Sequence, residues 1–134
     1  MIPRRALGGL LAVALPGANA ASGAEPWQHR QVGALTLHFA AIPAPGATRH
    51  LHDVVITVRD ATGSGLDDAI VTATIAATLH AEVVELALAR RPGTFEWRGT
   101  APLPPRDVYR IAVEVRRPGM PPASARFVHR QLQP

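Results

Sequence analysis

Two histidines stand two residues apart at the head of an apolar stretch, in the segment RHLHDVVITVRD (residues 49–60). Residues two apart on a β-strand project from the same face, so the imidazoles of His50 and His52 can reach one ion. Imidazole nitrogen suits both Cu(II) and Zn(II), at about 2.0–2.1 Å for zinc. The pair predicts a copper or zinc site. The alternative is a strand that begins at Val54, with both histidines in solvent.

A metal site at this pair needs further ligands, because catalytic zinc takes three protein ligands and structural zinc four. His80, His38, Asp53 and the amino terminus of an exported chain are the available donors, and sequence spacing does not show which of them converge. The predicted metal ligands are His50, His52 and His80. We otherwise expect no cofactor, with copper or zinc as the alternative.

Other polar residues give weaker patterns. His29 and His129 lie near the two ends of the expected folded region and are expected in solvent. Acidic residues flank the glycine-rich segment DATGSGLDD (60–68), but not at the alternating positions of a calcium-binding EF-hand loop. This segment is therefore expected to be a capped hairpin loop.

No catalytic constellation is present. The chain has no cysteine, which excludes thiol nucleophiles, thiolate metal sites and disulfides. None of the three serines after residue 20 lies in a nucleophile elbow. Phe95, Trp97 and Tyr109 are either a ligand platform or core residues, and their alternation favours the core. We expect a protein that is not an enzyme.

The elements that position these side chains are short β-branched runs separated by proline and glycine. The predicted strands are residues 34–41, 51–60, 69–79, 82–89, 94–99, 108–116 and 123–131. Such runs predict an all-β, immunoglobulin-like β-sandwich of about seven strands. Residues 77–90 also fit a helix, because alanine and leucine are good helix formers. The predicted core residues are Val54, Ile56, Val71, Ile75, Leu86, Tyr109, Ile111 and Val113.

The first twenty residues have the layout of a secretory signal peptide. Arg4 and Arg5 precede an apolar run from residue 6 to 15, and Ala18-Asn19-Ala20 is a small-x-small cleavage signal. The run is shorter than the roughly 20 apolar residues that span a bilayer. We expect residues 1–20 to be removed, 21–33 to be a flexible lead-in, and 34–131 to be the domain. An uncleaved anchor is the alternative. The mature protein is then periplasmic or secreted, without a membrane span.

The charge pattern does not favour nucleic acid as a partner. All 14 basic residues are arginines, set against 10 acidic residues, and two of the arginines belong to the expected signal peptide. The other arginines are scattered singly or in pairs, without the basic stripe and interleaved aromatics of a nucleic-acid-binding surface.

Several segments resemble the YtkA-like family of exported domains and the related FixH-like family. They are residues 35–75, RRPGTFEW (90–97), VYRIAVEVRRPG (108–119) and ARFVH (125–129). The resemblance implies a small extracytoplasmic β-sandwich that serves metal transport or respiratory-oxidase assembly. Members often carry a methionine- and histidine-rich stretch where this chain has AATLHAEVVEL, which retains only His80. We expect a non-catalytic accessory domain with a protein partner in a membrane or exported complex. The alternative is a copper- or zinc-binding module that uses His50 and His52.

Overall fold

The computed structural model describes residues 27–46, 50–62 and 66–131, and all regular structure in this part of the chain is β-strand. The strands are β2 (Gln28–Val32), β3 (Leu35–Pro43), β4 (Leu51–Arg59), β5 (Ile70–Ala77), β6 (Val83–Ala87), β7 (Ala89–Arg90), β8 (Glu96–Pro102), β9 (Asp107–Arg116) and β10 (Ala123–Gln131). The expected signal peptide, residues 1–20, lies outside the described residues. Among the described residues, no helix is long and apolar enough to cross a membrane.

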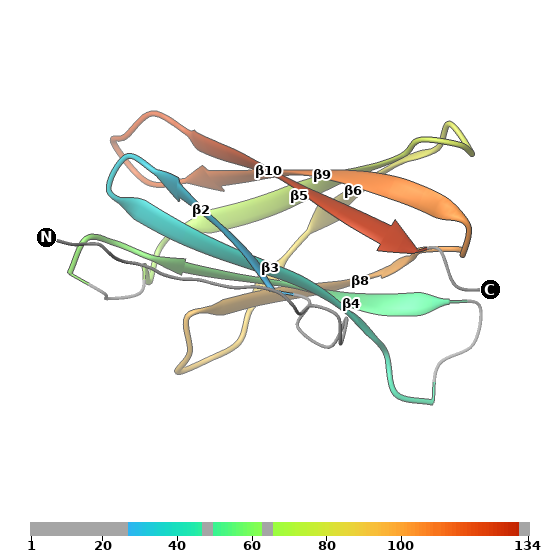
Figure 1. The fold of residues 1–134 in the computed structure, drawn as a ribbon. Coiled ribbons are helices and arrows are strands. Elements are labelled where there is room, and N and C mark those ends of the chain that lie inside the picture. The colour runs from blue at the N-terminus through green and yellow to red at the C-terminus, as the bar shows by residue number, and fades with distance from the viewer. Residues whose placement is uncertain (1–26, 47–49, 63–65, 132–134) are drawn as a thin grey trace, which may run out of the picture.

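The strands form two antiparallel sheets packed face to face (Figure 1). One sheet has the order β2-β3-β4-β8-β7 and the other β10-β9-β5-β6. Apart from the added edge strands β2 and β6, this order matches the immunoglobulin arrangement, in which strands A, B, E and D form one sheet and C, F and G the other. The predicted β-sandwich is confirmed.

Strand alternation builds the core as the sequence predicts. On β4, Val54, Ile56 and Val58 point between the sheets and have no exposed surface. Phe39 from one sheet stacks on Phe127 from the other, with ring centroids 5.2 Å apart. All eight predicted core residues are buried except Leu86, which is half-buried and packs against the core.

The expected flexible lead-in at residues 21–33 is wrong over residues 28–32. These residues form β2, which pairs with β3 at the edge of the five-stranded sheet. Their sequence, QHRQV, lacks apolar alternation because this edge strand exposes most of its side chains. The Gln28 side chain also reaches the edge of β10, where its amide donates to the Val128 carbonyl at 2.5 Å. Gln28 thereby ties the two sheets together.

Residues 77–90 contain no helix: a loop at 78–82 is followed by β6 and β7, which lie in different sheets. β6 pairs with β5, whereas β7 pairs with β8. At the crossing, the Leu88 N–H donates to the Val71 carbonyl at 3.1 Å. Gly99 on β8 leaves room for this crossing, because a Cβ there would lie 2.8 Å from a methyl group of Leu88. The crossing explains why one predicted strand is observed as two.

Tyr109 forms the hydrogen bond that characterises a tyrosine corner. Its side chain is buried near the start of β9, and its hydroxyl donates to the Pro104 carbonyl at 2.5 Å. In immunoglobulin-like domains, a tyrosine at this corner bonds back to the backbone a few residues upstream. The loop before β9 is therefore anchored to the core.

We expect Tyr109 to ionise far outside the ordinary range. Burial and, to a smaller extent, the nearby carboxylates of Asp107 and Glu82 together raise the pKa of its phenol to about 12. Tyr109 is the only tyrosine in the chain, so ultraviolet titration reads this group alone. Titration in guanidinium is the control and should return the ordinary value of 10.0. Ionisation of the native protein near that value would show that the phenol is not enclosed.

Candidate functional site

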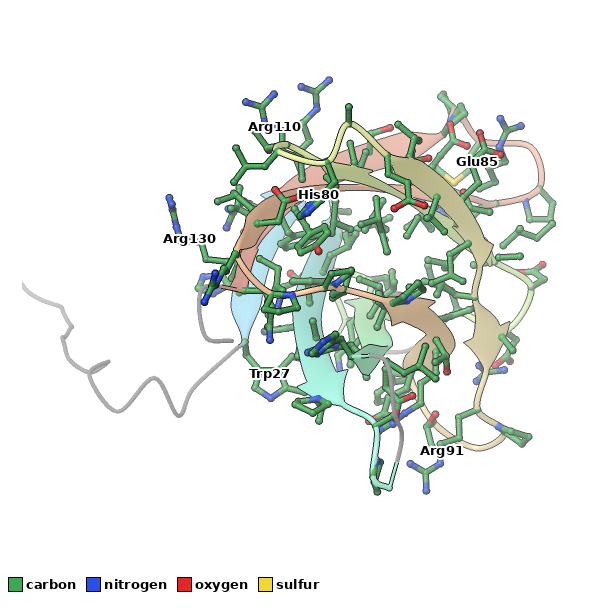
Figure 2. The ribbon with its side chains drawn as sticks, turned by 90° about the vertical axis from the view of Figure 1, so that its right-hand side faces the viewer. Trp27, His80, Glu85, Arg91, Arg110 and Arg130 are labelled. Carbon is green, nitrogen blue, oxygen red and sulfur yellow. The ribbon has the colours of Figure 1, made fainter. Side chains whose placement is uncertain are left out.

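Four of the six histidines belong to chain segments at one end of the sandwich, the end where Figure 2 labels His80. The start of β4, the turn after β5, the start of β9 and the end of β10 meet there. We call this the histidine end, defined by His50, His52, His80 and His129. The fold therefore brings together residues that lie up to 79 positions apart in the sequence.

His50 and His52 do not share a strand face. His50 precedes β4 in a turn, with a φ of 59° and an exposed side chain. Its positive φ interrupts the strand alternation, so the expectation that both imidazoles project from the same strand face is wrong for His50. The alternative is wrong in its strand start and for His52, because β4 begins at Leu51 and His52 is only 3% exposed, whereas His50 is exposed as this alternative expects. The two residues instead meet through the His50 carbonyl, which lies 2.8 Å from Nδ1 of His52.

His52 instead faces His129, which lies on the opposite sheet. Their ring centroids are 5.7 Å apart and the rings lie edge-on at 62°. The ring of Tyr109 also stacks with that of His129, at 6.4 Å between centroids. His129 was expected in solvent, and this expectation is wrong because strand alternation turns its side chain inward. The signal was present in ASARFVHRQ, where Ala125, Phe127 and His129 alternate.

Burial keeps His129 in its neutral form. Burial lowers the pKa of its imidazole, and the neighbouring His52 lowers it further. A hydrogen bond with the Gln131 side chain acts in the opposite direction without reversing the shift. A neutral imidazole has one nitrogen with a free electron pair, which is the form that binds metal ions.

His80 has a different partner. Its side chain is 54% exposed on the turn after β5, and its Nδ1 bonds to the carboxylate of Asp107. Within the part of the chain that the structure describes, no three or more histidine and acidic side chains form a group that could hold a metal ion. His80 is thus not brought into one ligand cluster with His50 and His52. Metal binding by these three residues stays a prediction.

Asp107 organises the turn that carries His80, and sequence reasoning missed it. Its side chain is fully buried. Its carboxylate accepts hydrogen bonds from the Leu79 N–H and the Val108 N–H at 2.7 Å, and from the His80 N–H at 3.1 Å. Burial alone raises the pKa of Asp107, but these bonds and the His80 ring outweigh burial and lower the pKa to about 2. The carboxylate is therefore a structural anion.

His38 and Asp53, which were also considered as donors, lie on the outer face of the five-stranded sheet, and the amino terminus of an exported chain lies outside the described residues. His38 pairs across the strands with His29, with ring centroids 5.8 Å apart. Burial lowers the pKa of His38, and the charges of His29 and Arg59 lower it further. Asp53 accepts a hydrogen bond from Thr100 at 3.2 Å and lies 3.6 Å from the Arg98 guanidinium. These residues lie apart from the inward-facing pair of the histidine end.

A second candidate surface is the outer face of the four-stranded sheet. It contains a groove of about 420 Å³. The groove is lined by Thr72, Ala73, Thr74, Glu85, Leu86, Ala87 and Glu114. A smaller hollow of about 140 Å³ shares Thr74 and is bounded by Arg110 and Arg126. Figure 2 shows Glu85 and Arg110 on this same side of the molecule. Small side chains at the outward positions of β5 leave the face hollow between oppositely charged borders.

Comparison with known proteins supports the fold. No family model and no curated protein matches the chain. The crystal structure of a DUF4426 family protein from Pseudomonas aeruginosa PAO1 is similar, with a TM-score of 0.66 and 16% sequence identity. The match covers 80% of this chain and 95% of that protein. A likeness at this identity shows a shared β-sandwich fold. Membership of the YtkA-like or FixH-like family stays a prediction.

Proposed function

We propose that this chain is an exported, non-catalytic accessory domain that binds a segment of a protein partner across the outer face of the four-stranded sheet. The groove beside Glu85, with the adjoining hollow beside Arg110, is the observation that carries the proposal. The layout of residues 1–20 supports export, and the resemblance to the YtkA-like family supports a partner in a membrane complex of respiration or metal transport.

The charged residues around the groove determine which side chains a bound segment should carry. Within the described residues, Glu85 forms no ion pair, and Glu114 lies 2.9 Å from Arg116 at the rim of the groove. Arg110 and Arg126 border the adjoining hollow. A bound segment therefore places a basic side chain toward the glutamates and an acidic one toward the arginines, since such complementarity fixes register and orientation. The threonine floor supplies hydroxyl groups for hydrogen bonds with the segment.

Site-specific crosslinking in cells tests this proposal. A photoreactive residue at Thr74, in the groove, should capture one partner in the periplasm. The same residue at Thr57, on the outer face of the other sheet, is the matched control and should not. Reversing both borders with Glu85→Arg and Arg110→Glu should reduce the Thr74 crosslink at least about tenfold, the effect of roughly 1.4 kcal/mol. Equal crosslinking at both positions, or no effect of charge reversal, would contradict the proposal.

A copper- or zinc-binding role is the second candidate, and the contact between His52 and His129 favours it. The pair first considered, His50 and His52, has the side chain of His50 in the turn before β4. The ligand pair of this second candidate is therefore His52 and His129.

A further inference from the structure

We infer that His52 and His129 bind a single Zn(II) or Cu(II) ion between the two sheets, through Nε2 of His52 and Nδ1 of His129. This site is independent of the proposed partner groove, which lies on the outer face of the four-stranded sheet. The inference rests on the placement of the rings, the state of their nitrogens and the burial of His52.

Strand register directs both rings to the same place. His52 continues the inward column of Val54 and Ile56 on β4, and His129 continues that of Ala125 and Phe127 on β10. The two columns belong to different sheets, so the rings meet across the open end of the core. Both strands are held in their sheets by backbone pairing, so the backbone positions from which the two rings project are fixed.

The spacing of the rings suits one ion. A zinc ion lies about 2.1 Å from an imidazole nitrogen, so an ion between two imidazoles holds their ring centroids roughly 5–6 Å apart. The observed separation is 5.7 Å.

One nitrogen of each ring is hydrogen-bonded, and this bond fixes which nitrogen has the free electron pair. Nδ1 of His52 must carry its proton, because the His50 carbonyl at 2.8 Å can only accept. Nε2 of His129 donates in the same way to the Gln131 side-chain oxygen at 3.1 Å. The free electron pairs are then on Nε2 of His52 and Nδ1 of His129. Metal-binding histidines usually donate their other N–H to a carbonyl or carboxylate, and this pair has that arrangement.

Burial adds a further reason to expect a ligand here. His52 is 3% exposed, and its Nε2 has no hydrogen-bond partner within the described part of the chain. Buried polar atoms without a partner are rare and costly, so each one requires a ligand, an ion or a water molecule. A bound ion satisfies Nε2 of His52 and the neighbouring nitrogen of His129 together.

The proposed site supplies only two protein ligands, and this number sets its affinity for the ion. Two imidazoles leave at least two coordination positions for water, whereas a structural zinc site fills all four with protein ligands. We therefore expect dissociation constants in the micromolar range, about 1 μM or weaker. Binding at this level is reversible, so the ion can exchange with a stronger site elsewhere.

Titration of the untagged protein with Zn(II), followed by NMR of its six histidine rings, tests the site. We expect one equivalent to shift the ring nitrogens of His52 and His129 and to leave those of His29 and His38 unchanged. The His29 and His38 pair is the matched control, because it has nearly the same ring separation, 5.8 Å, on an open sheet face. This measurement needs no substitution and does not depend on the folding of a variant.

Calorimetry with substituted proteins completes the test. His129→Ala should weaken Zn(II) and Cu(II) binding at least about tenfold, while His29→Ala and His80→Ala should leave it unchanged. Circular dichroism confirms that each variant is folded. The inference is overturned if Zn(II) shifts the rings of His29 and His38, or of His80, in place of His52 and His129. Unchanged affinity in folded His129→Ala also overturns it.

Discussion

Asp107→Asn is expected to lower the melting temperature at pH 7 by about 10 °C, because the fully buried carboxylate loses its charge and the donors on one of its two oxygens lose their acceptor. The carboxylate offers oxygens to the Leu79, His80 and Val108 N–H groups and to the His80 ring. An amide has one oxygen and turns an NH₂ group toward the remaining donors. The turn after β5 and the start of β9 then lose the group that joins them.

The same substitution should flatten the acid dependence of stability. The pKa of Asp107 falls from an ordinary 3.8 to about 2 in the folded protein. Folding is therefore favoured by the ionised carboxylate. This contribution is complete above about pH 3.8 and is lost as the pH falls through about 2. The variant lacks this group, so it should lose less stability than the wild type over that interval.

Thermal denaturation at pH 7, 4, 3 and 2 measures both effects. Asp67→Asn is the control, because the side chain of Asp67 is 90% exposed and its ion pair with Arg90 is at the surface. Exposed ion pairs contribute about 0–1 kcal/mol, so this control should melt close to the wild type. A variant at position 107 that keeps the wild-type acid slope would show that the carboxylate is not the structural anion described above.

The sequence predicts the sandwich well because strand alternation is a local pattern. β4 and β9 bury alternate residues as expected, and Tyr109 takes its place in the core. The strand-or-helix ambiguity of residues 77–90 arises because alanine and leucine favour helices locally. The segment forms a strand where β6 pairs with β5, and helix propensity alone does not predict this contact. β2 is missed for a similar reason, because an edge strand needs no apolar face to be held by backbone hydrogen bonds.

The candidate site could be predicted only in part. The inward direction of His52 follows from alternation, but His50 leaves the pattern through a positive φ that the sequence does not mark. His129 could be assigned to the inner face of its strand, yet nothing in the sequence places it opposite His52. That contact depends on the packing of two sheets, whose alignment is set by side chains throughout the core. Asp107 was missed because a buried carboxylate is recognised only by its partners.

Phe127→Ala is expected to cost about 3–5 kcal/mol, the range for removing a large buried aromatic side chain from a core. Phe127 is 1% exposed and stacks on Phe39 across the sheets. Small domains are stable by about 5–15 kcal/mol, so this loss is a large part of the total. The matched control is Val128→Ala, the next residue on β10, whose side chain is 38% exposed. It should cost less than about 0.5 kcal/mol.

Urea denaturation monitored by tryptophan fluorescence measures these values, since Trp97 is buried in the same core. Combining Phe127→Ala with Phe39→Ala gives the coupling between the sheets. Stacked aromatic pairs contribute about 0.5–1.5 kcal/mol beyond the area they bury, so the double variant should lose less than the sum of the single losses. Strict additivity, or equal costs for Phe127→Ala and Val128→Ala, would mean that the strands do not face the core as described. His129, which shares the face of Phe127, would then point away from His52.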